Sequence, residues 1–300
     1  MSEVLLTETF RSASGAVRWG RVGEAGQDPV VLCHGTPFSS YVWRGIAQAL
    51  ADTDRYEVFV WDMPGYGESD MHAGQDVSLA AQGRVFVELL TEWGLREPVV
   101  VAHDFGGAVS LRAHLLHGAR YRALALVDPV ALAPWGSPSF RLLGRHADVF
   151  AQLPPALHQA LVREYVSSAS GPGLHPTVLD RLVRPWLGEL GQPAFYRQIA
   201  QADQTHTDEI QGRYGEIGIP ALVCWGEDDG WIPLAKGREL AGRIPGARFE
   251  PIAGAGHLVQ EDAPAELTAV LMDFLTEQSN GTEQSNGTEQ SDGQGFSVGP

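Results

Sequence analysis

Short, uninterrupted apolar runs recur along this chain and alternate with stretches of helical pattern. A run without polar alternation indicates a strand buried on both faces. Strands that alternate with helices predict a mostly parallel, doubly wound α/β sheet. The expected strands are 17–22, 30–33, 56–61, 99–102, 124–127, 221–225 and 247–252, and the expected helices include 78–93, 107–117, 234–243 and 264–275.

The alternation stops between about Pro134 and Gly215, where no comparable strand run occurs. This segment is helical in character and rich in Leu, Pro and Trp. We expect it to form a helical cap over the carboxyl edge of the sheet, where α/β proteins bind ligands. The predicted division is a core of residues 1–133 and 216–275 with a cap of residues 134–215.

The end of the chain has a different composition. The hexapeptides TEQSNG, TEQSNG and TEQSDG follow one another and contain no apolar residue to bury. Such a composition cannot offset the entropy lost on ordering. Residues 276–300 are therefore expected to form a disordered, low-complexity tail.

Charge and composition exclude several classes of partner. The formal net charge is −16 and the 21 Lys and Arg residues form no run, which argues against nucleic acid. The segment MSEVLLTETF has no basic start and no long apolar stretch, so we expect no signal peptide, no membrane span and a cytoplasmic location. Cys33 and Cys224 lie in apolar runs and are expected to be buried free thiols. No His, Cys or carboxylate cluster has metal-ligand spacing, so no metal or organic cofactor is expected.

The stretch VVVAHDFGGAV places a carboxylate, Asp104, at the end of an expected buried strand. Small residues (Ala102, Gly106 and Gly107) surround it, and an expected helix follows. A strand–turn–helix of this kind is strained and aims its central side chain out of the sheet as a nucleophile. An Asp before a helix is also a common N-cap, so this motif alone leaves both interpretations open.

Two further loops favour the nucleophile. In LCHGTPFSS, a tight turn after a strand can point the backbone N–H of Thr36 toward the N–H of Phe105. Two converging donors of this kind form an oxyanion hole. In IAGAGHLVQEDAP, His257 stands between the last strand and the last helix, where it can activate water as a general base.

Taken in order, the motifs HGTPFSSYVWR, WDMPGYGESD, HDFGG, WGEDDGWIP and GAGHLVQEDAP resemble the α/β-hydrolase superfamily. Within it they resemble the aspartate-nucleophile branch of epoxide hydrolases and haloalkane dehalogenases, over about Val17 to Leu275. The resemblance implies an alkyl ester on Asp104 that a water activated by His257 then cleaves. It places the acid that orients this histidine at Asp229, with Asp128 at an earlier strand end as the alternative.

The resemblance leaves the leaving group open. An epoxide hydrolase needs acidic O–H donors from the cap, and Tyr196 in GQPAFYRQIA resembles one of the two tyrosines that commonly serve. The other is less clear, because Tyr165 lies further along than expected. His146 and Phe150 occupy the expected neighbourhood instead.

A haloalkane dehalogenase usually has Trp directly after the nucleophile and often Asn after the HG pair. This chain has Phe105 and Thr36 there, so a cap tryptophan, Trp135 or Trp186, would have to hold the halide. We therefore expect an epoxide hydrolase that acts with water on an apolar small molecule. A dehalogenase with an atypical halide site and a non-catalytic ligand-binding protein are the alternatives, and the sequence indicates no oligomeric state.

Overall fold

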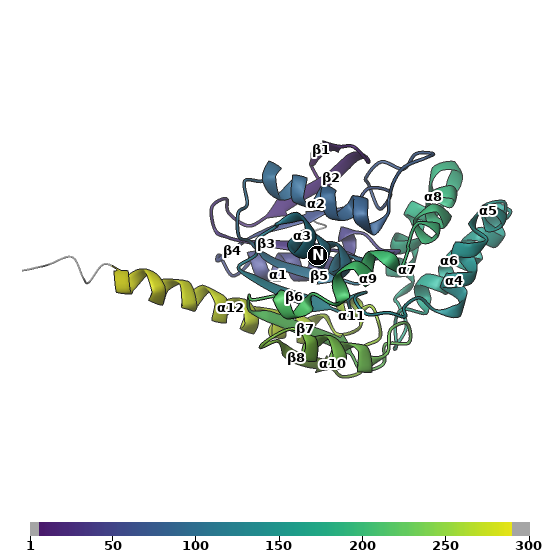
Figure 1. The fold of residues 1–300 in the computed structure, drawn as a ribbon. Coiled ribbons are helices and arrows are strands. Elements are labelled where there is room, and N and C mark those ends of the chain that lie inside the picture. The colour runs from purple at the N-terminus through teal and green to yellow at the C-terminus, as the bar shows by residue number, and fades with distance from the viewer. Residues whose placement is uncertain (1–5, 290–300) are drawn as a thin grey trace, which may run out of the picture.

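The computed structural model describes residues 6–289 and the side chains of residues 6–279. Its centre is an eight-stranded sheet in the order β1-β2-β4-β3-β5-β6-β7-β8 (Figure 1). The pairs β1–β2 and β2–β4 are antiparallel and every other pair is parallel, which confirms the predicted architecture. The strands are β1 (Glu8–Ser12), β2 (Gly15–Val22), β3 (Asp28–Cys33), β4 (Tyr56–Trp61), β5 (Val99–His103), β6 (Ala123–Val127), β7 (Ala221–Gly226) and β8 (Arg248–Ile252).

Seven of these strands match the expected ones to within two residues at either end. The exception is β1, which was not predicted. Its sequence, ETFRS, is mostly exposed at the edge of the sheet and contains only one large apolar residue. The central strands β5, β6 and β7 are buried at every position, as their continuous apolar runs predicted. Strand β4 is also buried throughout, although it contains Glu57.

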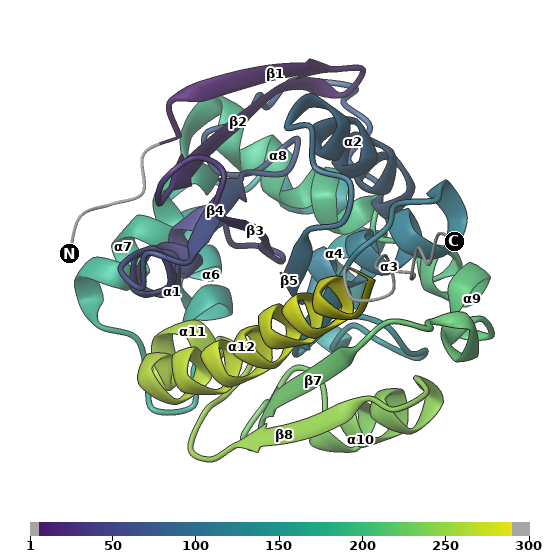
Figure 2. The same cartoon turned by 90° about the vertical axis from the view of Figure 1, so that its left-hand side faces the viewer.

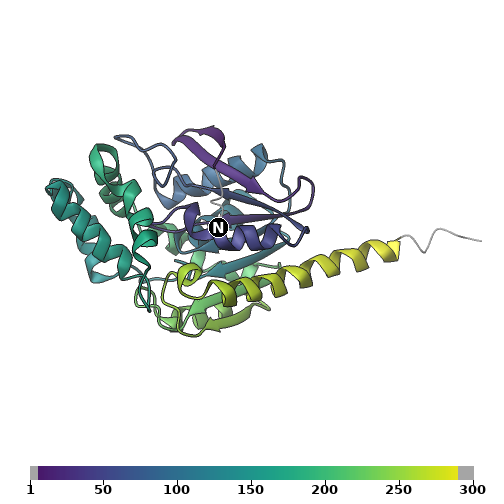
Figure 3. The same cartoon turned by 180° about the vertical axis from the view of Figure 1, so that it is seen from behind.

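Helices cover both faces of the sheet. On one face α1 (Arg44–Ala51), which follows the 3-10 turn η1 (Ser40–Trp43), packs against α12 (Pro264–Glu289) (Figure 3). On the other face α2 (Leu79–Glu92) packs against α3 (Phe105–His117) (Figure 1). The short α11 (Val259–Asp262) precedes α12, and α10 (Leu234–Arg243) packs against β7 and β8 (Figure 2). The sheet is therefore shielded from water on both sides.

The segment between β6 and β7 is helical, and the structure shows no strand there. The helices α4 to α8 gather at one end of the molecule, opposite the end toward which α12 projects (Figures 1 and 3). The exact cap boundaries at residues 134 and 215 stay a prediction. The elements are α4 (Pro138–Arg145), α5 (Ala147–Phe150), α6 (Pro155–Ser167), α7 (Pro176–Val183), η2 (Arg184–Trp186), α8 (Gly188–Ala200), α9 (Thr205–Gln211) and η3 (Tyr214–Glu216).

The last helix departs from the expectation of a disordered tail beginning at residue 276. Helix α12 continues to Glu289, because Glu and Gln are good helix formers and an existing helix needs no new nucleus to extend. The first repeat also contacts the core: Arg55 donates to Thr276 Oγ1 at 3.1 Å, and Ser279 donates to Asp28 Oδ2 at 2.8 Å. The remainder of the expected tail, residues 290–300, lies outside the described residues.

Two expectations from composition can be compared with the structure. Cys33 and Cys224 are buried and free, as predicted. Over residues 6–289, no helix has both the length and the apolar character that crossing a membrane requires.

Candidate active site

Asp104 stands alone in the turn between β5 and α3, with φ 48° and ψ −116°. L-residues seldom adopt positive φ, and such strain is typical of functional turns. The turn also needs small neighbours: a Cβ on Gly35 would lie 2.3 Å from Asp104 Cβ, and one on Gly106 would lie 2.6 Å from the His34 carbonyl oxygen. The Asp104 side chain caps no N–H of α3, so the N-cap interpretation is wrong.

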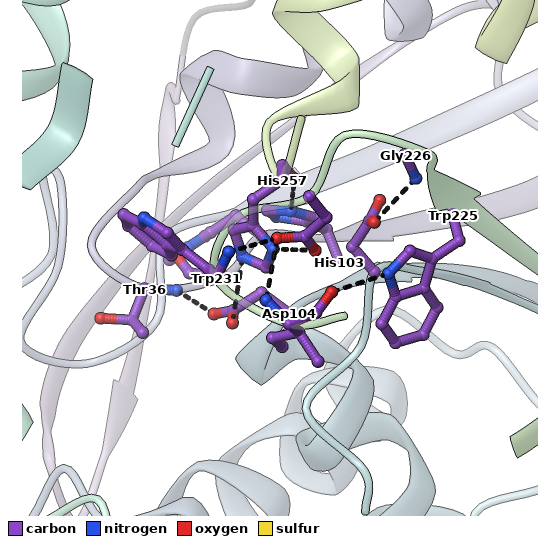
Figure 4. Close-up of polar contacts among 12 residues, drawn as sticks. Thr36, His103, Asp104, Trp225, Gly226, Trp231 and His257 are labelled. Atoms are coloured by element: carbon purple, nitrogen blue, oxygen red, sulfur yellow. Dashed lines mark hydrogen bonds and ion pairs between the residues drawn. The ribbon is translucent and has the colours of Figure 1, made fainter. Parts of the chain in front are cut away.

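Both carboxylate oxygens of Asp104 face groups that the sequence singled out (Figure 4). The backbone N–H of Thr36 donates to Oδ1 at 2.6 Å. Oδ2 lies 3.4 Å from Nε2 of His257. The N–H of Phe105 is the first of α3 and so has no acceptor within the helix. The structure thus brings these four residues together.

His257 is held from two sides. Its Nδ1 lies 2.9 Å from Oδ2 of Asp229, whose Oδ1 accepts from the backbone N–H groups of Trp231 at 2.7 Å and Ile232 at 2.9 Å. Its carbonyl oxygen lies 2.9 Å from Nε2 of His103, and its own side chain is fully buried. The loop conformation therefore fixes both the acid and the imidazole.

The charges in this group reinforce one another. Burial disfavours a charged imidazole, but the carboxylates of Asp229 and Asp104 outweigh it and raise the pKa of His257 well above its usual value. Burial likewise opposes the charge on Asp229, yet the adjacent imidazole and two backbone N–H donors hold the pKa of its carboxyl below the usual range. Both carboxylates therefore favour the protonated form of the imidazole.

Asp128, the alternative acid, does not pair with the histidine. It ends β6 at φ 42°, is fully buried, and accepts from the backbone N–H of Gly226 at 2.9 Å. Burial and the nearby charge of Asp229 raise the pKa of the Asp128 carboxyl well above its usual value. The structure therefore pairs His257 with Asp229.

Asp128, Asp229 and His257 also offer ligand atoms that lie within 4.8 Å of one another. A metal requires deprotonated ligands. Here one carboxyl favours its neutral form, and the other two groups already share a hydrogen bond. The geometry fits an acid–histidine pair better than a metal centre, and the expectation that no cofactor is needed stays a prediction.

A cavity opens beside Asp104 between the core and the cap. Its walls are mainly apolar and aromatic, and Tyr165 on α6 is the one expected cap tyrosine among them. The ring of Tyr165 packs against Trp231, with centroids 4.9 Å apart, and no residue of the described chain hydrogen-bonds its hydroxyl. The lining residues are Thr36, Asp104, Phe105, Val130, Trp135, Gly136, Ser137, Phe140, Tyr165, Trp231 and Ile232.

The two cap tryptophans have their N–H groups engaged. Trp135 lines the cavity, but its Nε1 donates to Thr207 Oγ1 at 2.8 Å. Trp186 does not line it, and its Nε1 donates to the carbonyl oxygen of Pro37 at 2.7 Å. Neither indole N–H is left for a halide in this conformation.

The other expected cap residues lie away from the cavity, which corrects the expectation that they contact the leaving group. The Tyr196 hydroxyl lies 2.9 Å from Nδ1 of His158, inside the cap. The opposite nitrogen of that histidine faces a carbonyl oxygen, so Nδ1 accepts from the tyrosine. Phe150 packs on the same tyrosine, and His146 is exposed. These side chains serve the cap's own packing.

Sequence reasoning gave no role to several residues that contact the site. Trp231, within the quoted WGEDDGWIP, stacks on His257 with ring centroids 4.8 Å apart. Gln198 of α8 accepts hydrogen bonds from Thr36 Oγ1 at 2.7 Å and the Tyr66 hydroxyl at 3.0 Å, which joins the cap to the loop that follows β3. The tyrosine lies within the quoted motif WDMPGYGESD, which gave it no role, and no motif contains the glutamine.

The sheet, the strand–turn–helix at residue 104 and the acid–histidine pair on the following strand ends define a fold class. A family model described as "alpha/beta hydrolase fold" matches residues 28–264. The chain belongs to the α/β-hydrolase family and is a hydrolase of that fold.

Three similar proteins indicate which hydrolase activities occur among the relatives of this chain. A crystal structure of an alpha/beta hydrolase fold protein from Burkholderia ambifaria is 46% identical with a TM-score of 0.87, over 91% of this chain and 99% of that one. Epoxide hydrolase A of Mycobacterium tuberculosis is 28% identical over 90% of this chain and 97% of its own length. A 2-hydroxy-6-oxononadienedioate/2-hydroxy-6-oxononatrienedioate hydrolase of Paraburkholderia phymatum is 26% identical over 84% and 88%. The chain is thus similar to hydrolases of different chemistry.

Proposed function

We propose that this hydrolase opens epoxides of apolar small molecules with Asp104 as its nucleophile. The observation that carries the proposal is the carboxylate itself. It stands at the strained turn, where Oδ1 accepts from the Thr36 N–H and, within residues 6–289, Oδ2 faces no donor other than the His257 imidazole. The similarity to an epoxide hydrolase over nearly the whole chain supports the same choice.

In the first step, Oδ2 of Asp104 attacks a carbon of the epoxide ring. The carbon–oxygen bond breaks, and the departing oxygen takes a proton from the Tyr165 hydroxyl, which lines the cavity and has no other hydrogen-bond partner in the described chain. The product is an alkyl ester on Asp104. Covalent catalysis of this kind divides one difficult step into two easier ones.

In the second step, His257 removes a proton from water, and the hydroxide attacks the ester carbonyl carbon. The resulting oxyanion is stabilised by the N–H groups of Thr36 and Phe105. Its collapse breaks the carbon–oxygen bond of the ester, and the leaving oxygen takes the proton of the carboxyl group that forms on Asp104, which releases a diol and restores the carboxylate. Ester formation itself prepares this step. It removes the Asp104 charge, one of the two that raise the pKa of the imidazole, so His257 can give up its proton, which replaces the one that Tyr165 lost, and then act as the base.

The contacts of the tryptophans favour an epoxide over a halide. A departing halide needs free N–H donors, and the indoles of Trp135 and Trp186 donate to a threonine hydroxyl and a backbone carbonyl. Phe105 offers no side-chain donor. A dehalogenase would therefore need these donors to exchange partners on substrate binding.

Trapping of the ester tests the proposal. The protein with His257→Gln is incubated with styrene oxide or 1-bromobutane, and its intact mass is measured. We expect a gain equal to one styrene oxide molecule, located on Asp104 by peptide mapping, because the second step lacks its base. The matched control, Asp104→Ala with His257→Gln, gains nothing. An alkyl adduct and bromide release from 1-bromobutane alone would instead identify a dehalogenase, and no adduct from either reagent would contradict the proposed nucleophile.

A further inference from the structure

Asp128 lies wholly buried beside the acid–histidine pair, and one of its oxygens has no visible partner. Oδ1 accepts from the Gly226 N–H at 2.9 Å, whereas Oδ2 is buried and receives no hydrogen bond within residues 6–289. Side-chain oxygen or nitrogen atoms of Asp128, Asp229 and His257 lie within 4.8 Å of one another. An ionised oxygen buried without a donor is costly, so the unpartnered atom needs an explanation.

A proton on Oδ2 supplies that explanation. Two carboxylates this close cannot both be ionised without a large penalty. Asp229 is better supplied to hold the charge, since it has the imidazole of His257 and the N–H groups of Trp231 and Ile232. Asp128 has a single backbone donor. Asp128 is therefore the better place for a proton within this pair of carboxyl groups.

We propose that Asp128 is a neutral carboxylic acid in the resting enzyme and that its Oδ2–H donates a hydrogen bond to a carboxylate oxygen of Asp229. Asp128 is then a positioning residue: it acts on the acid that orients His257 and touches no reacting atom. This proposal rests on the proposed function in one respect only, namely that Asp229 and His257 act in ester hydrolysis.

The hydrogen bond has a chemical consequence. It draws negative charge from Asp229 and so weakens the hold of that carboxylate on the His257 proton. His257 must be neutral to activate water in the second step, so the donor lowers the pH at which that step begins.

The other titratable groups near Asp128, Asp229 and His257 do not weaken the hold of Asp229 on the His257 proton. Burial lowers the pKa of His103 to about 4, so the imidazole is neutral above that pH. Burial raises the pKa of the Cys224 thiol beside Asp128 far above neutrality. Asp104, which faces His257 from the other side, loses its charge when the ester forms.

The experiment titrates the His257 imidazole by NMR in Asp104→Asn protein, where the amide reproduces the neutral ester. The signal is assigned by its loss in His257→Gln. Asp128 is then left unchanged or replaced by Asn or Leu. Asp128→Asn keeps an acceptor for the Gly226 N–H and an N–H donor for the acid, whereas Asp128→Leu removes both at similar volume.

We expect Asp128→Asn to leave the pKa of His257 where it is in the parent protein and Asp128→Leu to raise it by on the order of one unit. If Asp128→Asn lowered the pKa of His257, Asp128 would have to carry a negative charge in the parent protein, which would overturn the proposal. An unchanged pKa on Asp128→Leu would reduce the residue to a purely structural role and would also overturn it.

A second measurement does not depend on the folding of the Leu variant. Infrared spectra at neutral pH should contain the carbonyl stretch of a protonated carboxyl group, and Asp128→Asn should remove it. A carboxyl band that persists in this variant, or is absent from the parent, contradicts the proposal.

These readouts require no turnover, so they are separable from the test of the proposed function. If no adduct forms on Asp104, that function fails while the titration still decides the state of Asp128. If the adduct forms and Asp128→Leu leaves the pH dependence of ester hydrolysis unchanged, only the role of Asp128 fails.

Discussion

The core and the cap hold their polar groups in different ways. In the core, Asp104, Asp229 and His257 follow strand ends, and backbone N–H groups hold both carboxylates. In the cap, positions are set by side chains packing on one another, as in the contact of Tyr196 with His158. Strand ends of a parallel sheet meet at one edge whatever the neighbouring side chains are, whereas the direction of a cap side chain depends on how its helix packs.

In the core, the largest expected effect follows from removal of the proposed nucleophile. We expect Asp104→Ala to lower kcat by at least about 10⁴-fold, because no other group can form the ester. The measurement is diol formation from styrene oxide at saturating substrate, and a circular dichroism spectrum checks that the protein is folded. Residual activity within 100-fold of the parent, about 2.7 kcal/mol, would show that the carboxylate is not essential.

In the cap, a matched pair of tyrosine variants tests which hydroxyl group contributes to catalysis. We expect Tyr165→Phe to reduce kcat by on the order of 10²-fold, because the departing oxygen loses its proton donor. Tyr196→Phe removes a hydroxyl that faces His158 inside the cap, so it should leave kcat within about 3-fold of the parent and chiefly cost about 1 kcal/mol of stability. Equal losses of kcat would mean that the cap rearranges when substrate binds.

The pH dependence of the free energy of unfolding tests the raised pKa of the buried Asp128 carboxyl. The pKa of Asp128 is raised in the folded state, so its stabilising contribution is complete below its unfolded pKa of about 3.9 and is lost as pH rises toward the folded value. Asp128→Asn has no such loss. The free energy of unfolding of this variant should therefore rise relative to the parent between pH 4 and 7, by at most about 1.4 kcal/mol per pH unit. Urea unfolding across this range measures it, and a constant difference would contradict the raised pKa.

The smallest expected effect concerns the end of the last helix. Ending the chain after Leu275 removes the contacts of Thr276 and Ser279 with the core and should lower the free energy of unfolding by about 1 kcal/mol. Ending it after Ser279 keeps both contacts and should change that value by less than about 0.5 kcal/mol. Thermal unfolding of the two truncated proteins gives the comparison, and equal values would show that the contacts contribute nothing.

The difference between core and cap also explains which parts of the structure could be predicted from the sequence. The apolar runs predicted the central strands because these are buried on both faces, and the apolar and aromatic residues of the half-buried β2 and β8 marked those strands too. In contrast β1, short and largely exposed at the edge, carried no such signal. The motifs located Thr36, Asp104 and His257 because each stands at a strand end. The contact of Gln198 with Thr36 depends on where α8 packs against the loop that follows β3, which no local sequence pattern encodes.

The turn at residue 104 has a consequence for how this scaffold changes over evolution. Its conformation is set by Gly35 and Gly106, which leave the backbone room, and not by the carboxylate it presents. The N–H of Thr36 and the imidazole of His257 would serve a hydroxyl at that position as well as a carboxylate. A few substitutions at the site could therefore change the kind of bond that such a protein breaks, whereas substitution of Gly35 or Gly106 would disturb the turn itself.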